Sequence, residues 1–276
     1  VFTTPGGNAN AVKELVICGL LLSSRGILQG HSFIESLSNK DLDDLTNLVE
    51  TNKKNFKGSE LKGKTIGIIG LGAIGSLLAQ TVSSMGMNII GYDPNISIDS
   101  AWQLPKEVKK ADTLEYLLSN SDYISLHVPL IDETKDLISK DSIKYIKEGA
   151  RLINLSRGGI VNNNDVLYAL ENNKISSFVT DFPTPEMVKR SIEFSDVILL
   201  PHLGASTEEA EVNCAIMAAE QAIKFLNNGE IVNSVNFPAV RLGRSTNFRL
   251  VIIHKDEPGV IGNITGEIAH KQHSSI

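Results

Sequence analysis

The sequence predicts an α/β fold built on a doubly wound parallel sheet. Two observations predict it: a strand, glycine turn, helix and second strand lie between Lys64 and Asp93, and strands alternate with helices from there to residue 201. The expected strands are apolar on both faces, which is typical of parallel sheets covered by helices on both sides. Ligands of such sheets bind beyond the carboxyl ends of the strands, so functional residues are expected just after strands.

The elements are expected in a regular order. A helix over 8–24 and a polar connector over 30–58 with a weakly amphipathic helix precede the first strand. Strands are then expected at 65–70, 88–93, 122–127, 150–155, 176–181 and 197–201, and helices at 75–86, 113–120, 139–147 and 164–173. A last helix is expected to begin at Ser206 as N-cap, with Glu209 completing a capping box, and to end at Asn228-Gly229.

The first turn carries the G-x-G-x-x-G pattern at Gly70, Gly72 and Gly75. Gly70 permits a tight turn, Gly72 permits close approach of a diphosphate, and Gly75 lets the helix pack on the strand. The free N–H groups and the dipole of the following helix favour a bound anion. The pattern alone also fits a glycine-rich turn that merely packs, but its place between a strand and a helix favours dinucleotide binding.

Asp93 ends the second strand, eighteen residues after Gly75. Its carboxylate can accept hydrogen bonds from both ribose hydroxyls, whereas a 2′-phosphate would meet like charge. The next residues, 94–97, contain no Arg or Lys to neutralise that phosphate. The sequence therefore predicts NAD rather than NADP as the cofactor.

Bulk properties exclude several classes of protein. The net charge of −6 argues against a nucleic-acid or acidic-membrane surface. The longest apolar run, 15–22, is shorter than the ~20 residues a membrane span needs. The six histidines are scattered and the two cysteines are far apart, so no metal site is expected. No signal peptide is visible, and a cytoplasmic location is expected.

Three side chains that follow strands suit acid–base chemistry on a hydroxy acid. Arg157 precedes two glycines after the fourth strand, Glu186 follows the fifth, and His202 follows the sixth. An arginine can bind a substrate carboxylate with two charge-assisted hydrogen bonds, a histidine can remove the hydroxyl proton, and a carboxylate can fix its tautomer. Arg157 could instead form a surface ion pair, and His202 could be a packed strand-end residue. His127, after the third strand, is expected mainly to pack.

Residues 63–240 resemble the D-2-hydroxyacid dehydrogenase family, an NAD-binding Rossmann-like fold. The segments 70–75, 127–130, 154–159 and 201–207 match its signatures in the same order, and 5–15 and 235–238 resemble the members that act on 3-phosphoglycerate. The resemblance implies oxidation of 3-phospho-D-glycerate to 3-phosphohydroxypyruvate, the committed step to serine, with Arg157 binding substrate, His202 as acid/base and Glu186 orienting it. It places cofactor contacts at Ala73, Ile74, Asp93, Val128, Pro129, Leu155, Ser156, Asp181, Gly204 and Ala205.

The sequence departs from the family at the turn after the fifth strand. With Asp181 and Glu186 in the family's acidic positions, Phe182 comes one residue early. Alignment on the phenylalanine would instead put Thr180 and Pro185 in the acidic positions. We adopt the register of Asp181 and Glu186. The family's substrate lobe, built mostly before Val1, is not seen in this sequence, so the residues that bind the substrate phosphate are not identified.

Three segments are expected: an NAD-binding domain over 1–205, a crossover helix and exit segment toward a substrate domain over 206–240, and a truncated ACT-like regulatory segment over 246–276, opening with a strand at 248–254. The resemblance also implies a homodimer or higher homo-oligomer. Two alternatives stay open. One is a glyoxylate/hydroxypyruvate reductase or another D-2-hydroxyacid dehydrogenase, and the other is a non-catalytic NAD-sensing interaction protein of the same fold.

Overall fold

The computed structural model describes residues 1–241, 243, 246–247 and 250–272. The chain forms two compact units, one of residues 4–215 and the other of residues 1–3 with 216–276. The larger unit contains every residue that the sequence predicts to bind cofactor or substrate. Within the described residues, no helix is long and apolar enough to cross a membrane.

The larger unit is built on one seven-stranded parallel sheet with the order β3-β2-β1-β4-β5-β6-β7. The order reverses between β1 and β4, which pair in register from Ile66 and Tyr123. Such a reversal opens a crevice at the carboxyl ends of the strands. The sheet confirms the predicted fold, and its strands are β1 Thr65–Ile69, β2 Asn88–Tyr92, β3 Lys109–Lys110, β4 Tyr123–Leu126, β5 Ala150–Asn154, β6 Ile175–Thr180 and β7 Val197–Leu199.

Helices surround this sheet and extend into the smaller unit. They are α1 Ala9–Ser24, α2 Ile27–Ser36, α3 Leu42–Asn52, α4 Ala73–Ser84, α5 Ile98–Trp102, α6 Leu114–Asn120, α7 Lys140–Ile143, α8 Asn163–Glu171, α9 Pro185–Glu193, α10 Glu208–Asn228 and α11 Val260–Gln272. Two short 3-10 helices, η1 Lys53–Phe56 and η2 Gly158–Ile160, complete the set. Helix α10 crosses the boundary between the units.

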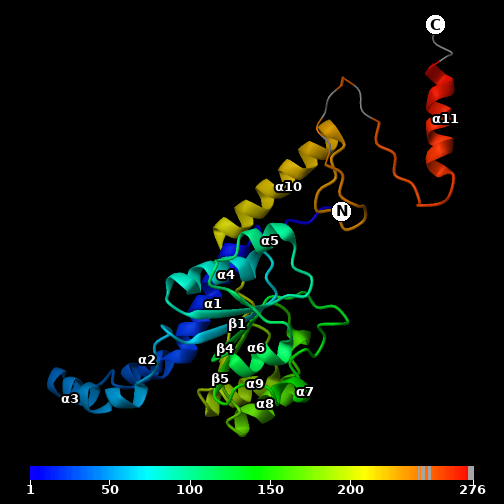
Figure 1. Cartoon of the computed structure of the whole chain (residues 1–276). Coiled ribbons are helices and arrows are strands. Elements are labelled where there is room, and N and C mark those ends of the chain that lie inside the picture. The colour runs from blue at the N-terminus through cyan, green and yellow to red at the C-terminus, as the bar shows by residue number, and fades with distance from the viewer. Residues whose placement is uncertain (242, 244–245, 248–249, 273–276) are drawn as a thin grey trace. The chain divides into compact units, whose positions relative to one another are not determined.

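Two hydrophobic clusters lie on the two faces of the sheet. Figure 1 shows the helices that flank the sheet. On one face, Val16 of α1 and Leu78 of α4 pack with Ile68 of β1. On the other, Leu117 of α6 and Val166 of α8 belong to the second cluster. Because strands covered on both faces are apolar throughout, the continuous apolar runs of the sequence correspond to central strands. Packing on both faces fixes the strands, so that their carboxyl ends lie along one side of the sheet.

The structure differs from the sequence predictions in short elements. Strand β3 and the helices α5 and α9 were not predicted, and α7 is shorter than the helix expected over 139–147. The predicted capping box of α10 is wrong: the Thr207 hydroxyl, not that of Ser206, accepts from the Ala210 N–H at 3.1 Å. The Ser206 N–H is used by the preceding turn, where it donates to the Leu203 carbonyl.

In the smaller unit the first residues of the chain pair with the segment that follows α10. Phe2 and Ser234 form an antiparallel bridge, and the Phe2 ring lies edge-on to Phe225 at 5.5 Å. The strand predicted at 248–254 is wrong for residues 250–254, which are irregular, while 248–249 lie outside the described residues. A strand needs a neighbour to satisfy its backbone groups. The helix start expected near residue 260 is confirmed by α11.

Candidate active site at the carboxyl edge of the sheet

The glycine turn after β1 has the shape that its sequence predicts. Gly70 has φ +92°, and a Cβ there would lie 2.6 Å from the His127 carbonyl oxygen. A Cβ at Gly75 would collide with the Gly70 carbonyl, so α4 can approach β1 only because residue 75 has no side chain. A Cβ at Gly72 would meet nothing within 4 Å. Gly72 therefore faces open space above the turn.

The amino end of α4 is left without a side-chain cap. Gly72 is its N-cap residue and offers no side-chain acceptor to the first N–H groups. By contrast, Thr113 caps α6 through Tyr116 N–H, and Asn162 caps α8 through Asp165 N–H. Uncapped N–H groups at a helix start, together with the helix dipole, form an anion site.

Asp93, just after β2, stabilises this turn by accepting hydrogen bonds from backbone N–H groups. Its Oδ2 accepts from the Leu71 N–H at 2.8 Å, and its Oδ1 accepts from the Asn95 N–H at 2.9 Å. Each carboxylate oxygen has further lone pairs. Asp93 is thus held beside the glycine turn with capacity to accept additional hydroxyl groups.

His127 is used for packing at the end of β4. Its Nε2 lies 2.8 Å from the Ser125 hydroxyl, and burial lowers its pKa to about 4. Its carbonyl closes against Gly70. The imidazole is neutral at physiological pH, and Val128 and Pro129 follow it at the crevice edge.

Arg157 leaves β5 on a turn organised by Asn154. The Asn154 amide donates to the Arg157 carbonyl at 2.9 Å, and its Oδ1 accepts from the Ser156 N–H and hydroxyl. The Arg157 guanidinium is exposed and donates to the Ser156 carbonyl. Within the described residues it forms no ion pair with an acidic side chain. A free guanidinium at a strand end can bind an anionic substrate group.

Asp181 lies just beyond β6 and is almost fully buried, at 1% exposure. Its Oδ2 accepts from the Gly204 N–H at 3.3 Å, while its buried Oδ1 has no hydrogen-bond partner within the described residues. Burial raises the pKa of Asp181, opposed by the Gly204 N–H and by the charges of His202 and Arg157. Asp181 therefore lies within electrostatic range of two predicted catalytic residues, Arg157 and His202.

His202 occupies the tight turn after β7. Its φ is +54°, a left-handed conformation that is uncommon outside glycine, and its exposed ring lies 5.1 Å from the Phe182 ring. Gly204 is buried behind it, and Ala205 follows. Phe182 is a residue that the sequence reasoning used only for alignment, because nothing in the pattern shows that its ring meets a histidine twenty residues away.

Glu186 occupies the first turn of α9 and is fully exposed. Its own backbone N–H, the Thr184 hydroxyl and the charge of Lys189 lower its pKa. These contacts belong to the start of α9. The described contacts of Glu186 do not include His202, so its predicted role in orienting the imidazole stays a prediction.

Comparison with known proteins decides the family. Residues 20–204 match the model of the D-isomer specific 2-hydroxyacid dehydrogenase NAD-binding domain. The chain belongs to this family. The match confirms the predicted Rossmann-like fold, the family resemblance and the NAD cofactor class.

Curated relatives and solved structures agree with this assignment. The chain is 35% identical to D-3-phosphoglycerate dehydrogenase of Haemophilus influenzae over 96% of the chain and 62% of that protein. It is 34% identical to the Bacillus subtilis enzyme of the same name, over 87% of the chain and 43% of that protein. An NAD⁺-bound 3-phosphoglycerate dehydrogenase of Entamoeba histolytica superposes with a TM-score of 0.66 at 28% identity, covering 86% of this chain and 68% of that one. The chain therefore spans only 62% and 43% of the lengths of these two curated relatives.

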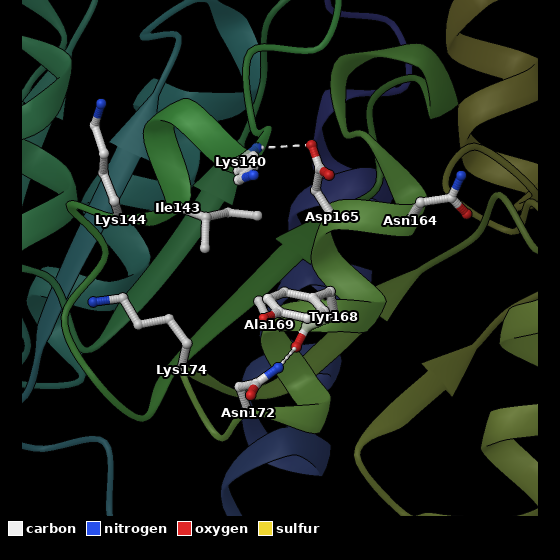
Figure 2. Close-up of a pocket in the computed structure, with 9 residues that line it drawn as sticks. All are labelled: Lys140, Ile143, Lys144, Asn164, Asp165, Tyr168, Ala169, Asn172 and Lys174. Carbon is white, nitrogen blue, oxygen red and sulfur yellow. Dashed lines mark hydrogen bonds between the residues drawn. The ribbon is translucent and has the colours of Figure 1, made fainter.

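A hollow away from this edge of the sheet lies between α7 and α8. Figure 2 shows Lys140, Asp165 and Tyr168 around this space of about 700 Å³. The residues that line it include none of the predicted cofactor or catalytic residues. Within the described residues no group of three or more His, Cys, Asp or Glu side chains is placed to hold a metal ion.

Proposed function

We propose that this chain forms the NAD-binding part of a D-3-phosphoglycerate dehydrogenase. The observation that carries the proposal is the placement of an open glycine turn, Arg157 and His202 at the carboxyl ends of β1, β5 and β7 of one parallel sheet, in a domain that matches the family. The choice of 3-phosphoglycerate as substrate rests on the curated relatives. They align with most of this chain and are named D-3-phosphoglycerate dehydrogenase.

The residues present fit a dinucleotide. Gly72 leaves open space, and the start of α4 has N–H groups without a side-chain cap, as a diphosphate needs. Asp93 stands at the ribose position with free acceptor capacity, and its negative charge disfavours a 2′-phosphate. We infer further contacts from Val128, Pro129, Leu155, Ser156 and Ala205 at the crevice edge.

The chemistry divides between the cofactor and the chain. NAD, when bound, supplies the acceptor for the hydride that leaves C2 of the hydroxy acid. Arg157 binds the substrate carboxylate through two charge-assisted hydrogen bonds and polarises the neighbouring C2 oxygen. His202 accepts the hydroxyl proton as the C2–O bond becomes a carbonyl, and it returns that proton in the reverse direction.

A turnover assay with 3-phosphoglycerate, glycerate and lactate tests the proposal. We expect NAD reduction with 3-phosphoglycerate. Turnover with lactate or glycerate alone would point to another D-2-hydroxyacid dehydrogenase. NAD binding without turnover of any substrate would favour a non-catalytic NAD sensor, a reading that suits the outward position of Glu186.

The substitution His202→Ala tests the assigned acid–base role. We expect turnover to fall by roughly 10²- to 10⁴-fold, the usual contribution of a positioned acid–base group, with NAD affinity nearly unchanged. His31→Ala is a matched control, because His31 lies on the exposed surface of α2 beside Glu35. A large loss of NAD affinity in His202→Ala would show that His202 is structural.

A further inference from the structure

A polar hollow lies at the amino ends of β5 and β6, at the opposite ends of the strands from the proposed cofactor crevice. Its volume is about 390 Å³, and five serines and three cationic residues are among those that line it. Within the described residues no acidic side chain lines it, although the whole chain has a net charge of −6. The cationic residues are Arg25, Lys57 and Arg151. We call this space the amino-end hollow.

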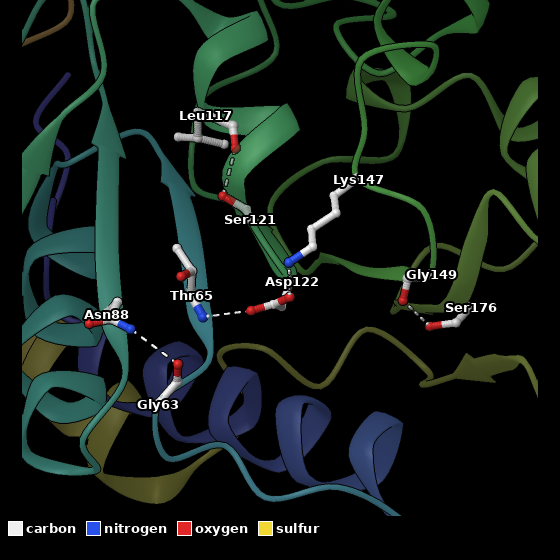
Figure 3. Close-up of polar contacts among 9 residues, drawn as sticks. All are labelled: Gly63, Thr65, Asn88, Leu117, Ser121, Asp122, Lys147, Gly149 and Ser176. Carbon is white, nitrogen blue, oxygen red and sulfur yellow. Dashed lines mark hydrogen bonds and ion pairs between the residues drawn. The ribbon is translucent and has the colours of Figure 1, made fainter.

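The pairing of β5 with β6 places Arg151 beside Ser177 in the amino-end hollow. The register shifts by one residue before Arg151, which pairs with Ser177, and Ser176 is left out of the pairing. Such a bulge bends the strand and re-aims its side chains. The Ser176 hydroxyl fixes the bulge by donating to the Gly149 carbonyl at 2.6 Å (Figure 3). Arg151 and Ser177 therefore lie on adjacent strands at the same level of the sheet.

The Arg151 guanidinium is held in place but is not neutralised. Its Nε donates to the Ser23 carbonyl in the last turn of α1 at 2.8 Å, and its Cζ lies 5.2 Å from the centre of the Tyr123 ring. These contacts by themselves would make Arg151 a tie between α1 and the sheet. Within the described residues, however, its two terminal nitrogens form no hydrogen bond or ion pair. A fixed guanidinium with free terminal N–H groups suits a two-pronged bond with a phosphate or carboxylate.

Two buried oxygens at the amino-end hollow also lack partners. Ser177 is 5% exposed, and its hydroxyl has no hydrogen-bond partner within the described residues. Gln29 of α2 donates from its amide to the Ser195 carbonyl at 3.4 Å, while its Oε1 is buried without a partner in the same part of the chain. Buried polar atoms are normally hydrogen-bonded. One water molecule would satisfy either oxygen, but it would leave the cationic residues without a counter-charge and would fill only ~30 Å³ of the space.

The positive charge extends beyond the amino-end hollow. An adjoining space shares Arg25 and Lys57 with it and is also lined by two further lysines and one acid, Lys53, Lys54 and Glu60. Lys53 is paired with Glu50, whereas Arg25, Lys54 and Lys57 form no ion pair within the described residues. A cluster of unpaired cations attracts anions at long range and raises their local concentration.

We propose that the amino-end hollow binds the phosphate group of a small hydroxylated metabolite. Arg151 and Ser177 donate to the phosphate oxygens, and Gln29 Oε1 accepts from a hydroxyl group of the ligand. A phosphate monoester carries about −1.5 to −2 charges at neutral pH, so it offsets more of the positive lining than a carboxylate does. This inference goes beyond the proposed dehydrogenase activity and does not depend on it, because the lining residues include none of the predicted catalytic or cofactor residues.

The test is a titration of the complete chain with glycerol 3-phosphate at saturating NAD, followed by the backbone amide resonances. Bound NAD keeps the phosphate away from the glycine turn, and about 0.15 M salt screens loose surface binding. We expect a dissociation constant below about 1 mM, with the largest shifts at Arg151 and Ser177. Methyl phosphate, which has no hydroxyl group, should bind about three- to tenfold more weakly, and glycerol should not bind.

Substitutions in the amino-end hollow separate binding from stability. Ser177→Ala should leave the urea midpoint unchanged, because the lost hydroxyl has no partner, and should weaken binding of glycerol 3-phosphate about three- to tenfold. Arg151→Lys keeps the charge but loses the two-pronged bond, so it should weaken binding about tenfold. Lys110→Gln is the matched control, because it removes an exposed charge beside Asp112 and should change the affinity less than about twofold.

Three results would overturn the proposal. The first is a set of shifts centred on Ala73 that disappears with NAD, which would place the phosphate at the glycine turn. The second is an unchanged affinity in both Ser177→Ala and Arg151→Lys. The third is an equal loss of affinity in Lys110→Gln and Ser177→Ala, which would mean unspecific attraction. If Arg151→Lys is unstable, Ser177→Ala decides alone. A chain that binds no NAD would refute the proposed function, while the position of the phosphate-induced shifts would still test this site.

Discussion

Asp122 lies at the amino ends of the parallel strands and Asp181 at their carboxyl ends. The two carboxylates differ in their hydrogen-bond partners and in the direction of their pKa shifts. Asp122 precedes β4, where it accepts from the Thr65 N–H at 2.9 Å and pairs with Lys147 at 2.7 Å (Figure 3). Burial alone would raise its pKa, but these partners lower the pKa overall. Asp181 follows β6 with one bonded oxygen and a raised pKa. At the amino ends of the strands, the carboxylate of Asp122 joins two strands. At the carboxyl ends, one oxygen of the Asp181 carboxylate has no partner within the described residues.

The glycine turn provides the largest expected effects. Gly75→Ala should lower the free energy of unfolding by about 2–3 kcal/mol, because its Cβ would collide with the Gly70 carbonyl. Gly72→Ala should lower it by about 1 kcal/mol or less, since its Cβ meets open space, but should weaken NAD binding about tenfold by filling the approach to the diphosphate. Urea unfolding and calorimetric NAD titration measure the two effects. Equal destabilisation by both variants would show that Gly72 is only a packing residue.

At the amino edge, Asp122→Ala should cost about 1–2 kcal/mol of unfolding free energy, because it leaves the Thr65 N–H and Lys147 without their acceptor. The control is Asp112→Ala, whose carboxylate is 88% exposed beside Lys110 and should cost less than about 0.5 kcal/mol. Because the folded pKa of Asp122 is lowered, its contribution is present above the ordinary value of 3.8 and is lost as pH falls through the folded pKa. Urea unfolding at several pH values checks both statements. If the two variants were equally stable, Asp122 would have no structural role of this kind.

At the carboxyl edge, Asp181→Asn should change stability least and with the opposite sign. The folded pKa of Asp181 is raised, so its charge costs stability above that pKa, and the cost disappears as pH falls below 3.8. The variant should therefore equal the wild type in acid and be more stable by up to about 1 kcal/mol at neutral pH. Paired urea unfolding at pH values of about 3 and 7 tests the sign. A variant that is much less stable at neutral pH would mean that Asp181, like Asp122, joins elements of the fold.

The sequence predicts the sheet well because its signal is local. Apolar β-branched runs, the three glycines and Asp93 all lie within one strand–helix–strand unit. Strand β3 was missed because it consists of two exposed lysines with no apolar pattern. The Asp181–Gly204 and Phe182–His202 contacts are also invisible in the sequence, since they depend on how two loops cross. The role of Glu186 in orienting His202 stays a prediction, because the described contacts of Glu186 lie at the start of α9.

The most direct test of the account is an NAD titration of the isotope-labelled chain, followed by the backbone amide resonances. The N–H groups of Ala73 and Ile74 at the uncapped start of α4 should shift most, with Leu71 beside Asp93 shifting as well. Shifts confined to the hollow between α7 and α8, around Tyr168, would contradict the placement of the cofactor at the carboxyl edge.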